Sequence, residues 1–149
     1  MKKIAIWFLC LSIFGVQLLN AEEKFLSLKK NKTNVRYGPG LDYPIKYIYR
    51  KINLPVKQID KKENWRRIID LRNNSGWIHT SQLKEKSNSI IVLEDKILFK
   101  KPSNFSKPIA RLELGRLLII KKCENNWCKI TTGNYSGWIK ADNVWGSIK

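Results

Sequence analysis

Short runs of apolar residues alternate with polar turns along most of the chain, and this pattern occurs twice. In the first half, residues 56–60 and 65–71 form strand-like runs on either side of a polar turn. In the second half, residues 117–122 and 127–131 flank a similar turn. Outside residues 4–19, no window keeps the apolar period of 3.6 residues that an amphipathic helix requires. The pattern therefore predicts an all-β protein of short antiparallel strands.

Tryptophan positions show that the two halves are copies of one module. Trp65 lies 12 residues before Trp77, and Trp127 lies 11 residues before Trp138. In each copy a Ser-Gly pair directly precedes the second tryptophan. A difference of one residue fits a change of loop length within a duplicated β module.

Further motifs occur in the same order around these tryptophans. The first copy opens with Asn-Val-Arg-Tyr-Gly-Pro at residues 34–39 and closes with Gly-Trp-Ile-His at residues 76–79. The second copy departs from this opening at residues 97–102. It keeps the Gly-Trp pair at residues 137–138 and ends with Trp145 and Gly146. Together the motifs resemble those of bacterial SH3 domains. The resemblance implies two tandem five-stranded small barrels at residues 25–85 and 88–147, which a short polar connector should bring into contact.

The N-terminus has the pattern of an export signal. Lys2 and Lys3 precede residues 4–19, which carry no charge and are followed by polar residues. This apolar stretch is shorter than the roughly 20 residues that cross a bilayer as a helix. We therefore expect residues 1–21 to form a cleaved signal helix, and the remaining protein to be periplasmic or secreted.

The chain is strongly basic, and two explanations of its charge remain open. Its 29 Lys and Arg against 12 Asp and Glu give a formal net charge of +17. Loss of the two signal lysines leaves 27 − 12 = +15. Such a field attracts anionic partners, but Lys, Asn and Ile are also the residues that AT-rich codons favour. Export disfavours nucleic acid as the partner.

Strand parity divides the tryptophans into two classes. Trp65 has the opposite parity to Ile68, which should point into the core, so its ring is expected to face outward. The same argument applies to Trp127. Trp77 and Trp138 each follow a glycine and are expected in the core or at a barrel end.

The outward tryptophans are candidate ligand contacts. A Trp ring offers a flat apolar face and one hydrogen-bond donor. Tyr37, Tyr43 and Tyr47 on the presumed long first loop, together with Arg36, can extend such a surface near Trp65. Trp127 is the weaker candidate in the second copy. Packing of these rings against loops or the other module is the alternative. The Pro and Tyr that complete the groove of eukaryotic SH3 domains are replaced here by His79 and Gln82, and in the second copy by Lys140 and Asn143. The proline-rich ligand of those domains is therefore not carried over.

Two cysteines remain after signal removal. If Asn125 and Asn126 form a two-residue hairpin turn, Cys123 and Cys128 become a close non-hydrogen-bonded pair with side chains on one face. An exported compartment permits their oxidation. The sequence therefore predicts a disulfide between Cys123 and Cys128.

The sequence offers few of the residues that catalysis or metal binding requires. His79 is the one histidine of the chain, and it lies in the copy without the cysteines. A zinc site needs four converging ligands, and a cysteine hydrolase needs a base beside its thiolate. We therefore expect no enzyme, no metal and no cofactor.

These observations favour a non-catalytic binding module of the cell envelope. The expected ligand is peptidoglycan or a peptide segment of an envelope protein, contacted by aromatic residues on a basic surface. A structural adaptor with its aromatics buried in domain or partner interfaces is the alternative. Association with an anionic lipid surface is a third possibility.

Overall fold

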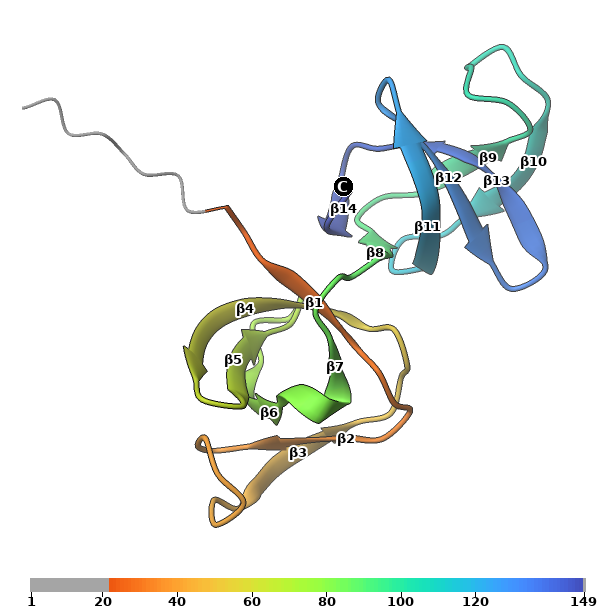
Figure 1. Ribbon diagram of the computed structural model, residues 1–149. Helices are drawn as coiled ribbons and strands as arrows, with labels where there is room; N and C mark the ends of the chain where they lie inside the picture. The colour runs from red at the N-terminus through yellow and green to blue at the C-terminus, as the bar shows by residue number, and fades with distance from the viewer. Residues whose placement is uncertain (1–21, 149) are drawn as a thin grey trace, which may run out of the picture.

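Each half of the chain folds into an antiparallel sheet of seven short strands (Figure 1). The structure is a computed structural model that describes residues 22–148. The predicted signal peptide, residues 1–21, lies outside this described part. Among residues 22–148, no helix has both the length and the apolar character needed to cross a membrane.

The two sheets have the same strand order. The first runs β3-β2-β6-β5-β4-β1-β7 and the second runs β10-β9-β13-β12-β11-β8-β14, which is the same order shifted by seven. The first sheet contains β1 (Phe25–Leu28), β2 (Thr33–Arg36), β3 (Ile45–Tyr49), β4 (Pro55–Lys62), β5 (Trp65–Ile69), β6 (Ser75–His79), the 3-10 helix η1 (Thr80–Gln82) and β7 (Leu83–Lys84). The second contains β8 (Ser89–Val92), β9 (Lys96–Phe99), β10 (Pro108–Leu112), β11 (Leu117–Glu124), β12 (Trp127–Thr132), β13 (Tyr135–Lys140) and β14 (Val144–Gly146).

The all-β duplicated architecture predicted from the sequence is confirmed, with more strands than the five expected per module. In the first module, bends at residues 29–32 separate β1 from β2. The two residues after η1 then pair with β1 as an additional short strand. In the second module, β14 pairs with β8 in the same way. The additional strands are thus short pieces at the ends of each module.

Two separate apolar clusters fill the interiors, so the modules do not share one core. The first module buries Leu26, Leu28, Val35, Val56, Ile68, Ile78 and Leu83. The second buries Ile90, Val92, Leu98, Leu112, Leu118, Ile120, Cys128, Ile130, Ile139 and Ala141.

Trp77 and Trp138 were expected in the core or at a barrel end, and neither belongs to these clusters, but Trp138 is buried at 8% exposure while Trp77 is half-buried. In β6 the burial pattern alternates, and Gly76 and Ile78 take the buried positions. A side chain at Gly76 would overlap Val35, so the residue facing the crossing strand must be glycine. Trp77 consequently points to the other face of the sheet. Trp138 is buried although it is not part of the second cluster, and the Lys122 amine lies 5.2 Å from its ring centre.

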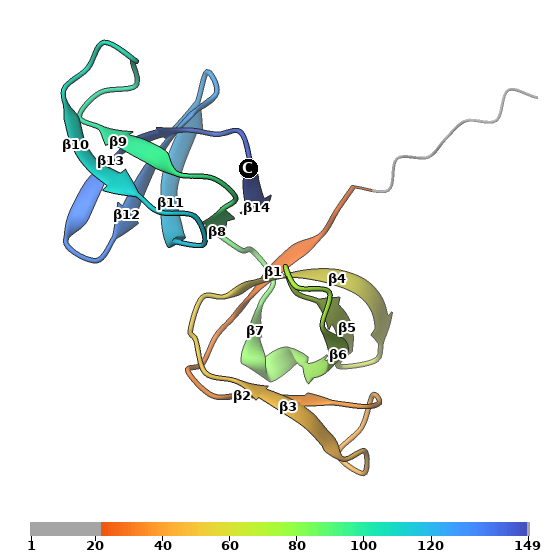
Figure 2. The same ribbon diagram turned by 180° about the vertical axis from the view of Figure 1, so that it is seen from behind.

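The modules touch, as the short connector predicted. The Trp145 indole Nε1 donates a hydrogen bond to the Pro55 carbonyl oxygen at 3.2 Å. The Trp145 ring also packs edge-on against Phe25, with ring centres 5.1 Å apart. Figures 1 and 2 show β1 of the first sheet beside the segment that leads into β8 of the second. The contact therefore joins the start of one module to the end of the other.

Candidate functional site

An open groove of about 470 Å³ lies on the first module between the loop at residues 37–44 and the helix η1. Its lining combines cationic, polar and apolar side chains from the two ends of the module: Lys30, Asn34, Arg36, Leu41, Trp65, His79, Ser81 and Gln82. Trp65 and Arg36 were predicted from the sequence as site residues. A groove of this kind can accept an extended chain.

The groove wall at residues 37–44 is held in shape from within. Arg36 Nη1 donates to the carbonyl oxygens of Leu41 at 3.3 Å and Tyr43 at 2.7 Å. The Tyr43 ring lies directly over Gly38, where any side chain would overlap it. The Tyr37 ring is 62% exposed and has the Lys46 amine 5.5 Å from its centre. Arg36 and Tyr43 thus position the loop, while Tyr37 is the open aromatic face.

Trp65 is much less accessible than its strand parity suggested. The ring lies outside the core cluster but is 8% exposed, so the prediction of an open outward ring is wrong. The His79 ring, at the end of β6, packs edge-on against it at 5.2 Å between centres. Trp65 therefore offers the groove a narrow apolar strip and not a broad platform.

The opposite wall is fixed by hydrogen bonds that hold η1. His79 Nδ1 accepts from the Ser81 amide at 3.2 Å and lies 2.8 Å from the Ser81 hydroxyl. The Asn34 amide donates to Gln82 Oε1 at 3.3 Å, which ties η1 to β2. In the sequence analysis, His79 and Gln82 were treated as replacements of groove residues, and His79 also as a candidate metal ligand or catalytic base. Sequence reasoning missed Leu41, whose one signal was an apolar residue within a polar loop.

Tyr47, which could have joined the surface near Trp65, belongs to a different part of the module. Its ring packs on the first core cluster, and its hydroxyl lies 3.4 Å from that of Tyr49. The Tyr49 hydroxyl donates to Asp70 Oδ2 at 2.9 Å. Burial is the largest cause that raises the pKa of both tyrosines, so both remain protonated at neutral pH.

The same position in the second module has different chemistry. Trp127 is half-buried, and its ring packs edge-on against Phe99 at 5.7 Å between centres. Phe99 pairs with Trp138 as Arg36 pairs with Trp77, so an aromatic ring stands where the first module has a guanidinium. Lys140 stands opposite Trp127 where His79 stands opposite Trp65. The two copies therefore cannot bind a ligand in the same way.

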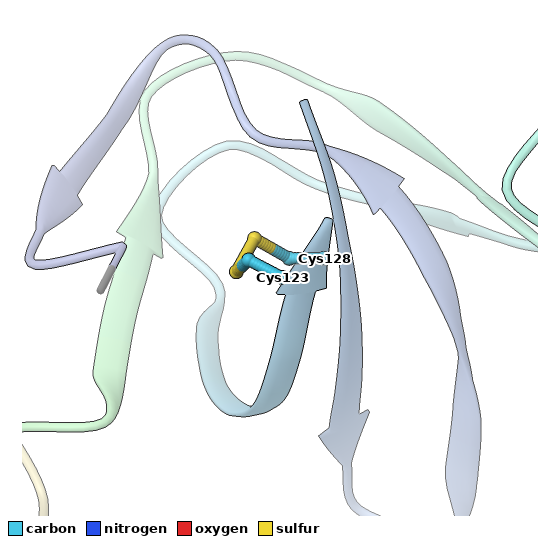
Figure 3. Close-up of a disulfide and its surroundings, with 2 residues drawn as sticks. All are labelled: Cys123 and Cys128. Atoms are coloured by element: carbon cyan, nitrogen blue, oxygen red, sulfur yellow. A yellow bond between two sulfur atoms is a disulfide. The ribbon is translucent and has the colours of Figure 1, made fainter. Parts of the chain in front are cut away.

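The predicted disulfide between Cys123 and Cys128 is confirmed (Figure 3). The cysteines are directly opposite in the β11–β12 register, with Cα atoms 4.1 Å apart. The turn residues Asn125 and Asn126 have φ values of 47° and 62°. Two positive φ values give the tight turn whose twist matches the strands. The bridge closes the end of this hairpin.

Among residues 22–148, no three His, Cys, Asp or Glu side chains are grouped so that they could hold a metal ion.

Comparisons with known proteins identify both modules. The family model described as bacterial SH3 domain matches residues 29–85 and 95–146. No protein with a curated description matches the chain. Similar solved structures are those of NlpC2 and NlpC1 from Trichomonas vaginalis, each at 14% sequence identity and a TM-score of 0.39. The match covers 84% of this chain but 48% and 46% of those proteins, so the chain spans about half their length.

Proposed function

The chain belongs to the bacterial SH3 domain family, and from this premise we propose that it is a non-catalytic binding protein of the cell envelope. The groove of the first module is its recognition site. The ligand is a peptide-bearing envelope component, either peptidoglycan or a segment of an envelope protein. The disulfide between Cys123 and Cys128 supports a location outside the cytoplasm, where such bonds persist.

The observation that carries this proposal is the chemistry of the groove lining. Leu41 is 76% exposed and presents an apolar side chain above the Trp65 strip. Lys30 and Arg36 supply positive charge, which pairs with the carboxylates of a stem peptide. Ser81 and Gln82 add polar groups suited to a peptide backbone. Because internal hydrogen bonds already hold both walls, the protein loses little conformational entropy when a ligand binds.

Sedimentation with purified sacculi tests the proposal. The wild-type protein should co-sediment at low salt, and Leu41→Ala should weaken binding about fivefold to tenfold because it removes an exposed apolar contact. His79→Ala should weaken it as well, since it loosens the wall formed by η1 and uncovers Trp65. Tyr135→Ala is the matched control, because Tyr135 is an aromatic residue that is 50% exposed on the second module.

Failure of the wild-type protein to bind sacculi or soluble muropeptides at low salt would remove peptidoglycan as the ligand. A photocrosslinking residue in place of Leu41 then tests the protein-segment version in native envelopes. Crosslinks that form equally well from position 135 would contradict recognition by the groove.

A structural adaptor is the second candidate, and the junction of the modules favours it. Phe25, Pro55 and Trp145 already bury aromatic surface between the two domains. In an adaptor, the fixed arrangement of the modules is what a partner recognises. Partner capture would then be lost with Trp145→Ala and retained with Leu41→Ala, the reverse of the result expected for the groove.

A further inference from the structure

The loop between β9 and β10 presents a phenylalanine to solvent with nothing covering it. Phe105 is 100% exposed, the highest value among the large apolar side chains of the described residues, where Leu41 follows at 76%. Figures 1 and 2 both show this loop projecting from the second sheet on the side away from the first. Scattered apolar residues are normal on protein surfaces, but a wholly uncovered ring at a projecting tip requires an explanation.

Hydrogen bonds hold this tip in one shape. The Lys100 amide donates to the Lys107 carbonyl at 3.0 Å and closes the base of the loop. The Ser103 hydroxyl accepts from the Phe105 amide at 3.2 Å, and the Ser106 hydroxyl accepts from the Lys101 amide at 2.8 Å. The ring is therefore presented by an ordered loop, so that docking costs little conformational entropy.

The surroundings of the ring are basic. Lys100, Lys101 and Lys107 are all exposed, and they take part in none of the ion pairs found within residues 22–148. From residue 96 to residue 112 the sequence contains no Asp or Glu. The loop that carries the exposed ring thus also carries three exposed lysines that take part in none of these ion pairs.

The equivalent loop of the first module has a different charge, although its Tyr37 is 62% exposed. Its base closes with the same bond, from the Tyr37 amide to the Pro44 carbonyl at 3.2 Å. It carries Asp42 and no lysine, and the Tyr43 ring folds back over Gly38. The fold of the module therefore does not require lysines in this loop.

We infer that the second module docks on an anionic phospholipid surface through this loop, with Phe105 entering the headgroup region and the three lysines pairing with lipid phosphates. An aromatic ring flanked by lysines has the composition of an interfacial membrane anchor. A bilayer supplies negative charge and an apolar layer together, which matches the loop on both counts. This membrane contact is independent of the groove, so the protein can hold an envelope ligand and a membrane at once.

Vesicle flotation tests the apolar part of the inference. The full chain is expressed with export, and the processed form of each variant is checked by mass so that all carry the same N-terminus. Wild type should bind vesicles of equal parts phosphatidylglycerol and phosphatidylcholine and should bind pure phosphatidylcholine far more weakly. Phe105→Ala should lower the partition coefficient about tenfold. Leu114→Ala is the control, since Leu114 is 64% exposed on the same module but follows Glu113.

The electrostatic part is tested by two double variants of equal charge. Changing Lys100 and Lys101 to Glu should abolish binding, since each lost lysine alone is worth about fivefold. Changing Lys61 and Lys62 to Glu, an exposed pair on β4, should cost much less. Equal losses in the two double variants, binding of Phe105→Ala at the wild-type level, or no binding by wild type would each overturn the inference. Equal losses in the two double variants would mean that the overall charge of the protein, and not this loop, attracts it to the vesicles.

Discussion

Lys96 carries a charge into the interior of the second module. Its side chain is 6% exposed, and its Nζ pairs with Glu94 at 3.0 Å and Asp142 at 3.1 Å. A buried amine without partners is costly, so these two carboxylates compensate for its burial. The hydrogen bond from Lys96 is the largest cause that lowers the pKa of both Glu94 and Asp142.

The lowered pKa of Asp142 predicts a pH dependence of stability. The carboxylate stabilises the folded state fully above its ordinary value of 3.8, and this contribution is lost as pH falls through the lower folded value. Asp142→Asn should therefore lower the free energy of unfolding at pH 7 by about 1 kcal/mol, a modest amount because the carboxylate is half-exposed. Urea unfolding should also show a smaller difference between pH 7 and pH 3 than in wild type. Glu63→Gln is the control, and an unchanged pH difference in Asp142→Asn would contradict the prediction.

Two glycines of the second module occupy restricted positions, one where two strands cross and one in a turn. Gly137 in β13 passes so close to β9 that an added Cβ would lie 2.7 Å from the Phe99 carbonyl oxygen and 2.9 Å from Leu98 Cγ. Backbone atoms cannot move aside as side chains can. Gly133, in the turn before β13, has a φ of 54° but open space around it. The two glycines are therefore required for different physical reasons.

This contrast predicts different costs for the same substitution. Gly137→Ala should destabilise the second module by about 2 kcal/mol or more, because the strands must separate. Gly133→Ala should cost about 1 kcal/mol, the penalty for a left-handed backbone at a non-glycine residue. Urea titration followed by far-ultraviolet circular dichroism measures both. Equal costs would mean that β9 and β13 can move apart freely.

The two modules have separate cores and one aromatic junction, so we expect them to unfold independently but to hold a fixed arrangement. The junction depends on Trp145, which contacts both Phe25 and Pro55. Trp145→Ala should leave the unfolding midpoint of the first module unchanged. It should also make the connector at residues 84–88 several-fold more sensitive to limited proteolysis, because local opening of this region becomes easier.

Trp145→Phe is the matched comparison, since it keeps a ring against Phe25 but loses the hydrogen bond to Pro55. Its proteolysis rate should lie between those of wild type and Trp145→Ala. A rate for Trp145→Ala equal to that of wild type would show that other contacts hold the modules together.

Much of the fold was predictable from the sequence, because neighbouring residues determine strands and tight turns. Alternating apolar residues and regularly spaced turns predicted strands, and the repeated tryptophan motifs predicted two modules. The disulfide between Cys123 and Cys128 was predictable for the same reason, since a two-residue turn fixes which residues face each other.

Only part of the candidate site was predicted from the sequence, because residues that are far apart in the chain form the groove. Arg36 and Trp65 were named from the sequence, and the groove contains both. The exposure of Trp65 was mispredicted because parity along a strand gives the direction of a side chain but not what the rest of the chain lays over it. Here the His79 ring packs against the Trp65 ring.

The sequence by itself thus determined the strand pattern, the duplication and the hairpin disulfide, all of which depend on neighbouring residues. The tertiary structure alone decided which aromatic rings reach solvent and which residues share a groove. Leu41 and Ser81 are 40 positions apart, and only the folding of the loop and η1 toward each other places them together. Accessibility is a property of the whole packed surface, so no local pattern of residues encodes it.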